Sequence, residues 1–177
     1  VAAAAGANLG FALAHLHNLP TVLAIDPEIV RALTRMGPDV KRNRQATEQF
    51  RHALLADRAL SQLAARLTGM VGKLDVDQVW VINAAGDCIA SGGFPAGATA
   101  TGVNYVDREY FWEARRDGSS QQFAVGRTTQ VPGIYHSAAV VDAGRFLGVV
   151  VVKVDVTRLA RLVSDANMFI TDENGVV

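Results

Sequence analysis

The stretch QFAVGRTTQVPGIYHSAAVVDAGRFLGVVVVKV, residues 122–154, decides the fold of this chain. It contains three apolar runs, at residues 122–125, 135–141 and 146–154. Runs of this length, rich in β-branched residues and bounded by Gly and Pro, are typical of β-strands. Ala143-Gly144 separates the last two runs and predicts a tight turn. The stretch therefore predicts three successive strands in an antiparallel meander.

A hairpin and a short helix are expected before these strands. Residues 79–82 and 88–90 are apolar and flank the turn sequence Ala-Ala-Gly-Asp, which predicts a β-hairpin. Residues 94–101 are rich in Gly, Ala and Pro and predict a loop. Residues 107–116 predict a short helix, with Asp107 as its cap and Gly118 after its end.

The first part of the chain has the apolar period of a helix. Leucines recur at spacings of three and four residues from Leu9 to Leu19, and Pro20 is expected to end or kink that helix. Asp26-Pro27-Glu28 predicts the start of a second helix, because it offers a capping acceptor, a first-turn proline and an acidic residue at the positive end of the dipole. Gly37-Pro38 predicts its end.

A single long helix is expected from about residue 44 to residue 70, with Gly69 and Gly72 marking its end. Its apolar stripe consists of Phe50, Leu54, Leu60, Leu63, Leu67 and Met70. Helices, two strands, a helix and three strands in this order predict an α+β fold, in which long N-terminal helices lie beside one antiparallel sheet.

Composition excludes several classes of protein. A chain of 177 residues fits one domain or one and a half. The chain has 17 Lys and Arg against 17 Asp and Glu, so it lacks the basic surface expected of a nucleic-acid-binding protein. Its single cysteine, Cys88, excludes an intrachain disulfide and a cysteine cluster for zinc. No metal site and no cofactor are expected.

The N-terminal residues raise the question of a membrane span. Residues 1–25 contain no Asp, Glu, Lys or Arg, but weakly apolar alanines dominate them and Asn, His and Pro interrupt them. A soluble helix is the favoured interpretation, and it would emerge from a span that lies before Val1. Since the chain starts at Val1 and carries no signal-peptide pattern, we expect it to be an excised part of a longer protein.

Catalytic motifs are missing from the sequence. It contains no P-loop, no GxGxxG after a strand, no HExxH and no GxSxG. His15 and His17 are two residues apart and do not share a helix face, which argues against a metal pair. Cys88 has no nearby histidine and is interpreted as a small packed side chain. A small enzyme acting on a carboxylate is therefore disfavoured.

Candidate ligand-binding residues gather between residues 104 and 137, where polar and aromatic side chains are interleaved. Pro132-Gly133 is expected to form a turn that brings Thr128-Thr129 and Tyr135 together. Strand alternation places Val149, Val151 and Lys153 on one face and Gly148, Val150 and Val152 on the other. The donors are Arg108, Tyr110, Arg127, Thr128, Thr129, Tyr135, His136, Ser137 and Lys153.

Arg108 and Lys153 of this set supply two cations beside several hydroxyls, with no matched acidic cluster, a combination that suits a small carboxylate. Lys153 lies in an apolar strand and needs an anion or solvent at its tip. Simpler interpretations stay open. Asp107 can be only a helix cap, Arg108 can be solvated or pair with Glu109 or Asp107, and Lys153 can extend to solvent from an edge strand.

Several segments together resemble a known family. They are Asn18-Leu19-Pro20 with Asp26-Pro27, residues 79–90, DREYFWEA at 107–114, FAVGRTTQVPGIYHSAAV at 123–140 and LGVVVVKVDV at 147–156. The chain resembles the extracytoplasmic double Cache (PDC, PAS-like) sensor domains of bacterial receptors, and among these the C4-dicarboxylate sensor histidine kinases. The likeness extends over most of the chain.

The resemblance implies a division of the chain into three parts. Residues 1–72 would form an N-terminal helical stalk and packing helices, residues 73–163 a membrane-distal PAS-like ligand-binding module, and residues 164–177 the start of a truncated membrane-proximal module. An internal similarity between residues 80–86 and 169–175 agrees with a second module, although any two hairpins can share such a pattern.

The resemblance also implies the site residues. Arg108 and Tyr110 match ligand-facing helix positions, Thr128 and Thr129 a hydroxyl pair, Tyr135 and Ser137 polar strand positions, and Lys153 the lysine that pairs with a carboxylate. The chain departs from the family pattern at Ile134, where an aromatic residue is frequent, and at His136. Both departures leave the identity of the ligand open.

The implied function is that of a periplasmic ligand-binding domain in a bacterial inner-membrane two-component histidine kinase. Its ligand would be a small organic acid such as succinate, fumarate or malate. The resemblance further implies a homodimer through the N-terminal helix, helix rearrangement as the signal, a cytoplasmic response regulator as partner, and no enzymatic activity in this segment itself. Alternatives are the sensor domain of a chemoreceptor or of a cyclic-dinucleotide enzyme, and a ligand-free PAS-like dimerisation module.

Overall fold

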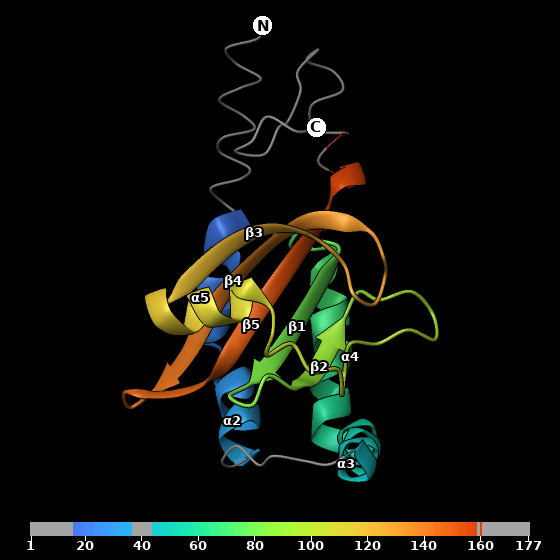
Figure 1. Cartoon of the computed structure of the whole chain (residues 1–177), viewed down its shortest axis with the longest axis vertical. Coiled ribbons are helices and arrows are strands. Elements are labelled where there is room, and N and C mark those ends of the chain that lie inside the picture. Colours follow the sequence, from blue (N-terminus) through green and yellow to red (C-terminus); the bar gives the residue numbers. More distant parts are fainter. Residues whose placement is uncertain (1–15, 37–43, 159, 161–177) are drawn as a thin grey trace, which may run out of the picture.

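A computed structural model of the chain describes residues 16–36, 44–158 and 160. Its centre is a five-stranded sheet with the strand order β2-β1-β5-β4-β3 (Figure 1). Every neighbouring pair of strands is antiparallel. The strands are β1 (Gln78–Asn83), β2 (Cys88–Gly92), β3 (Ser119–Val125), β4 (Pro132–Asp142) and β5 (Arg145–Asp155). The predicted hairpin and the predicted three-stranded meander are both confirmed.

Helices cover both faces of this sheet. On one face lie residues 16–24, which are helical, together with α2 (Pro27–Arg35) and α4 (Arg58–Val71). The helix α3 (Arg44–Ala56) packs against α4. On the opposite face lies α5 (Glu109–Asp117), which contacts β3, β4 and β5 and stands in front of the sheet in Figure 1. The predicted α+β class is therefore confirmed.

The capping aspartate Asp26 positions two of the helices that cover the aliphatic face of the sheet. The Asp26 carboxylate accepts from the backbone N–H of Glu28 (2.9 Å) and Ile29 (3.3 Å), as the sequence predicts. Arg66 of α4 pairs with Asp26 and with Glu28, so the same carboxylate links α2 to α4. The Arg66 guanidinium holds the pKa of Asp26 below its usual value. Gly37-Pro38, the expected end of α2, lies outside the described residues.

Two helix boundaries differ from the prediction. Residues 16–24 form one helical run, so Pro20 does not end it. The expected helix over residues 44–70 is divided at Asp57, whose carboxylate accepts from the backbone N–H of Leu60 (2.9 Å) and so starts α4 as a separate helix. The apolar stripe is still correct in part, because Leu54, Leu60, Leu63 and Leu67 are buried.

The start of α5 also differs from the prediction. Arg108, not Asp107, is the N-cap residue, and its side chain makes no capping hydrogen bond. The Asp107 carboxylate instead pairs with Arg127 (2.6 Å). Gly118 ends the helix with a φ of 91°, a conformation that favours glycine, as predicted.

The connection between β3 and β4 is the 126–131 loop rather than Pro132-Gly133. The backbone N–H of Gly126 donates to the Val131 carbonyl (2.9 Å), and the N–H of Gln130 donates to the Gly126 carbonyl (2.9 Å). Pro132 is already the first residue of β4 and pairs with Val125. The predicted turn is therefore displaced by several residues towards the N-terminus.

Strand alternation gives the two faces of the sheet separate cores. The face towards α2 and α4 is aliphatic and includes Val79, Val81, Val150 and Val152. The face towards α5 is aromatic and polar and includes Trp80, Tyr135 and Val151 with Tyr110 and Phe111 of α5. The predicted separation of Val150 and Val152 from Val149, Val151 and Lys153 is confirmed.

Some expectations lie beyond what the structure describes. The second module from residue 164 and the repeat at residues 169–175 both fall outside the described residues, and the three-part division of the chain stays a prediction. Within the described ranges, no helix combines the length and the apolar character needed to cross a membrane.

Candidate ligand-binding site

A pocket lies between the sheet, the start of α5 and the 126–131 loop. The sheet contributes Gln78, Trp80 and Tyr135, and the start of α5 contributes Arg108 and Tyr110. The pocket contains about 230 Å³ of unfilled space, part of it open to solvent. The space open to the centre of a water molecule is only about 10 Å³, which is room for about one water, so a larger ligand requires the pocket walls to move apart.

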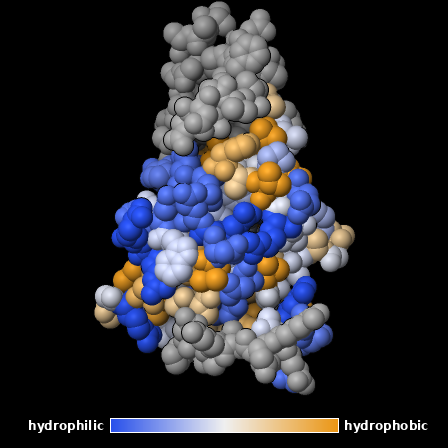
Figure 2. Space-filling model, in the orientation of Figure 1, coloured by the Kyte–Doolittle hydropathy of each residue, from blue (hydrophilic) through white to orange (hydrophobic). Residues whose placement is uncertain are grey.

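Loops form the remaining walls. Phe94 and Tyr105 come from the connection between β2 and α5, and Gly126, Arg127, Thr128 and Thr129 come from the 126–131 loop. Figure 2 shows hydrophilic side chains across the middle of the visible face, interrupted by smaller apolar patches. No Asp or Glu is among the residues that line the pocket.

Aromatic rings fix the shape of the inner wall. Tyr110 of α5 stacks on Tyr135 of β4 with ring centroids 5.4 Å apart and an interplanar angle of 5°. Trp80 of β1 meets the Tyr135 ring edge-on at 5.8 Å and lies 6.1 Å from the Tyr105 ring. Rings held on a strand and a helix by this packing have little rotational freedom, so their polar atoms keep fixed positions.

Four buried polar groups of this pocket have no hydrogen-bond partner among the described residues. They are the indole N–H of Trp80, the hydroxyls of Tyr110 and Tyr135, and Nε of Arg108. Leaving a buried donor unsatisfied costs about 1–3 kcal/mol, so folded proteins rarely retain several at one place. All four can donate a hydrogen bond, and together they offer a binding surface for an acceptor-rich ligand.

Burial keeps the two phenols in their donor form. It raises the pKa of Tyr110 far above its usual value and raises the pKa of Tyr135 to about 12. Burial also raises the pKa of Tyr105, whose hydroxyl lies 3.4 Å from Thr128 Oγ1. The phenols are therefore neutral at physiological pH.

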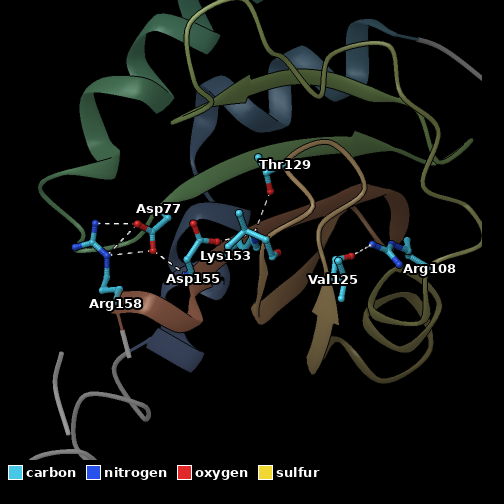
Figure 3. Close-up of polar contacts among 8 residues, drawn as sticks. Asp77, Arg108, Val125, Thr129, Lys153, Asp155 and Arg158 are labelled. Atoms are coloured by element: carbon cyan, nitrogen blue, oxygen red, sulfur yellow. Dashed lines mark hydrogen bonds and ion pairs between the residues drawn. The ribbon is translucent and has the colours of Figure 1, made fainter. Parts of the chain in front are cut away.

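Arg108 brings a positive charge to the pocket. Its Nη2 donates to the Val125 carbonyl (2.7 Å), and no carboxylate among the described residues pairs with its guanidinium (Figure 3). The two acidic neighbours in sequence are engaged elsewhere, since Glu109 accepts from Gln122 (2.6 Å) and Asp107 pairs with Arg127. The alternative of an Arg108 pair with Glu109 or Asp107 is therefore wrong.

Lys153 is fully buried and lies behind the pocket wall. Its ammonium pairs with Asp155 Oδ1 (2.5 Å) and donates to the Val131 carbonyl (2.8 Å) and to Thr129 Oγ1 (3.3 Å), as Figure 3 shows in part. Asp155 corrects the expectation of a cation without an acidic partner. Complete burial also excludes the alternative in which Lys153 extends to solvent.

The structure brings only some of the predicted site residues together in the pocket. Arg108, Tyr110, Thr128, Thr129 and Tyr135 line the pocket, as does Arg127. Lys153 contacts the pocket wall through Thr129. Ser137 lies under α5, where its hydroxyl donates to the Tyr110 carbonyl (2.9 Å). His136 belongs to the opposite, aliphatic face of the sheet, where it pairs across strands with Val152.

Some pocket residues were missed in the sequence. They are Gln78, Trp80, Phe94, Tyr105 and Gly126. The register of β1 and β5 pairs Gln78 with Lys153 and Trp80 with Val151, which puts both on the pocket face. All four residues of the run 79–82 are apolar, so no alternation of polar and apolar residues indicates which of them face the pocket. Phe94 and Tyr105 reach the pocket through the fold of a long loop, and no local sequence pattern predicts that position.

The described residues offer no evident metal or thiol chemistry. Among them, no three His, Cys, Asp or Glu side chains gather in a way that could hold a metal ion. Cys88 is fully buried, and burial raises the pKa of its thiol well above the usual value, so the thiol is unreactive.

Comparisons with known proteins find two curated relatives that share one name. No family model matches the chain. The chain is 30% identical over 132 residues to the C4-dicarboxylate transport sensor protein DctB of Rhizobium meliloti, covering 72% of this chain and 21% of that protein. It is 26% identical over 173 residues to the protein of the same name from Pseudomonas aeruginosa, covering 97% of this chain and 25% of that protein.

A solved structure has the same fold. The sensor domain of the V. cholerae histidine kinase DctB aligns with a TM-score of 0.72 at 22% sequence identity, covering 89% of this chain and 54% of that one. At this identity the structural likeness establishes the arrangement of helices and strands, not the ligand. The chain spans 21% and 25% of the length of the two curated relatives.

Proposed function

Because this chain is a PAS-like sensor domain of the double Cache type, related in sequence to C4-dicarboxylate sensor proteins, we propose that its pocket binds a small carboxylate. The proposed ligands are C4-dicarboxylates such as succinate, fumarate or malate. The whole protein would be a transmembrane two-component histidine kinase of a bacterial inner membrane, with this domain in the periplasm and a response regulator as its cytoplasmic partner.

One observation carries the proposal. The indole N–H of Trp80, the hydroxyls of Tyr110 and Tyr135, and Nε of Arg108 are buried without a partner among the described residues, and all four groups belong to residues that line one pocket. A carboxylate is acceptor-only and can take several such donors at once. Its hydrogen bonds to a guanidinium are charge-assisted and about twice as strong as those between neutral groups.

Charge favours an anion over a cation. The lining residues include Arg108 and Arg127 but no Asp or Glu, and the Arg127 charge is compensated by Asp107 while that of Arg108 has no described acidic partner. An ammonium ligand would find aromatic faces in this pocket but no carboxylate. An anionic ligand would supply the counter-charge that Arg108 lacks.

A ligand with two carboxylates would use two polar regions of the pocket wall. One carboxylate would meet Arg108 and the two phenols. The other would lie at the 126–131 loop near the hydroxyls of Thr128 and Thr129, beyond which Lys153 stands. Lys153 Nζ lies 5.7 Å from the centroid of the Tyr135 ring, so the second cation is close to the pocket although it does not line it.

Binding would signal by a shift in population between two helix packings across a homodimer formed through the N-terminal helix. Such a shift is limited by the difference in ligand affinity between the two states. The pocket and the residue 16–24 helix lie on opposite faces of one sheet, so β1, β4 and β5, which carry buried residues on both faces, are the elements that could connect them.

Thermal unfolding with succinate, fumarate and malate tests the proposal. A ligand at 100 times its dissociation constant should stabilise the domain by about 2.7 kcal/mol. Arg108→Gln should abolish the shift. Arg116→Gln is the matched control, because Arg116 is on the same helix, is exposed and pairs only with Asp117 among the described residues. An unchanged melting temperature with every acid would contradict ligand binding and favour the ligand-free dimerisation module.

A further inference from the structure

Three oxygens surround the Lys153 ammonium. It forms an ion pair with Asp155 Oδ1 at 2.5 Å and donates to the Val131 carbonyl at 2.8 Å and to Thr129 Oγ1 at 3.3 Å. Its side chain is fully buried, whereas 19% of the Asp155 side chain is exposed. Any ligand carboxylate that reaches Lys153 must therefore replace one of these acceptors.

Asp155 is the acceptor that a carboxylate can replace with least loss. Val131 O and Thr129 Oγ1 are neutral, and removing the anion would leave a buried charge unpaired, which is strongly destabilising. Exchange of one carboxylate for another keeps the charge compensated. The Asp155 side chain is 19% exposed although its Oδ1 is buried against the ammonium, so the displaced carboxylate would have to turn towards solvent, where water would replace the ammonium.

We propose that Asp155 is an internal competitor that holds Lys153 in the absence of ligand and that a ligand carboxylate must displace to bind this lysine. This inference rests on the proposed function, because it assumes that an anion enters the neighbouring pocket. Asp155 then sets affinity without touching the ligand: the apparent affinity falls by the fraction of molecules in which Lys153 is engaged.

The exchange is connected to the segment that follows β5. The backbone N–H of Asp155 donates to Asp77 Oδ2 (2.8 Å), and the Asp77 carboxylate also accepts from Arg158 Nη2 (3.0 Å) and Nε (3.1 Å). Figure 3 shows Thr129, Lys153, Asp155, Asp77 and Arg158 in succession from the loop to the chain after β5. Movement of Asp155 would therefore disturb the contacts that fix residues 156–158.

Titration of succinate into the 177-residue chain, measured by calorimetry, tests the competition. Asp155→Asn removes the anion and keeps the size and the backbone N–H, and it should bind succinate at least tenfold more tightly than the wild type. Asp142→Asn is the matched control, because Asp142 ends β4 in an exposed position at the opposite end of the β4–β5 hairpin. It should bind as the wild type does.

The outcomes separate the two proposals. If the wild type binds succinate and Asp155→Asn binds no more tightly, the proposal that Asp155 competes with the ligand is overturned, and the proposed function stands. If only Asp155→Asn binds succinate, the proposal is supported, because Asp155 then blocks binding in the wild type completely. If neither binds succinate or any of the other acids, the proposed function fails and the competitor fails with it.

A measurement on the wild type covers the case in which Asp155→Asn does not fold, since that variant leaves the Lys153 charge unpaired. Hydrogen exchange at the Asp155 amide and at residues 156–158 should become at least several-fold faster with saturating succinate, because the released carboxylate loosens the end of β5. Unchanged exchange rates there would overturn the competitor.

Discussion

The face of the sheet that carries α2 and α4 is packed with aliphatic side chains, whereas the face beneath α5 is built from aromatic rings and polar groups. The same strands supply both. Along β5, Val150 and Val152 enter the aliphatic core, while Val151 and Lys153 face the pocket side. The two faces are therefore separated by one residue in sequence and by the thickness of a sheet in space.

This difference separates the stability of the fold from its capacity to bind. Aliphatic burial is non-directional and contributes free energy in proportion to the apolar area removed from water. Unpartnered buried donors lower the stability of the fold, and they are useful only if a ligand satisfies them. Substitutions on the aliphatic face should change the free energy of unfolding, and substitutions on the pocket face should change affinity.

The largest expected effect is on the aliphatic face. Leu67 of α4 is 1% exposed and packs in the aliphatic core against the backbone of Gly92. Leu67→Ala should lower the free energy of unfolding by about 2–5 kcal/mol, because it leaves a cavity where the chain cannot collapse. Urea denaturation measures this loss. Succinate affinity at a temperature where the variant is folded should stay within a few-fold of wild type. A larger loss would show that the aliphatic face also determines ligand affinity.

The second effect concerns His136, the polar exception on the aliphatic face. It is fully buried, neither ring nitrogen has a partner among the described residues, and its ring centroid lies 5.8 Å from that of the exposed His17. Burial, and to a lesser extent the charge of His17, lowers the pKa of His136 to about 4 from the usual 6.5. The folded protein therefore keeps this ring neutral.

The sign of the pH dependence follows from that shift. Between pH 6.5 and about 4 the unfolded chain takes up a proton that the folded chain does not, so acidification through this window lowers the free energy of unfolding. The loss from this one group is at most about 3 kcal/mol. Urea denaturation at pH 7 and pH 4.5 should show it in the wild type and not in His136→Leu. Equal losses in both proteins would mean that other groups, common to both, carry the acid sensitivity.

How far the sequence predicts these faces depends on the element. Period-two alternation in residues 146–154 was sufficient to put Lys153 and Val151 on one face, and the same period places Asp155 beside Lys153, a pairing that the prediction overlooked. The division at Asp57 was missed because a capping aspartate can also be an ordinary exposed helix residue. The pocket position of Tyr105 depends on how a long loop returns to the sheet, which no local pattern encodes.

The third substitution should change both the free energy of unfolding and the affinity for succinate. Ser137 faces α5, and its hydroxyl donates to the Tyr110 carbonyl at 2.9 Å, so it fixes the helix that supplies a pocket phenol. Ser137→Ala should lower the free energy of unfolding by about 1 kcal/mol and should weaken succinate binding modestly. Paired urea denaturation and succinate titration measure the two losses. A full loss of binding with unchanged stability would mean that Ser137 contacts the ligand directly instead of supporting α5.

The smallest effect on stability, and the most informative one, is expected two residues away on the same face. The Tyr135 hydroxyl is buried without a described partner, while its ring stacks on Tyr110 and meets Trp80. Tyr135→Phe keeps the ring contacts and removes only the unsatisfied hydroxyl, so the free energy of unfolding should stay equal or rise by up to about 1 kcal/mol. Succinate affinity should nevertheless fall about tenfold, because one hydrogen bond to a charged ligand is lost. The contrary result is that Tyr135→Phe loses as much stability as Ser137→Ala and binds succinate as the wild type does. In that case the hydroxyl stabilises the folded state, and both faces of the sheet contribute to stability and not to ligand binding.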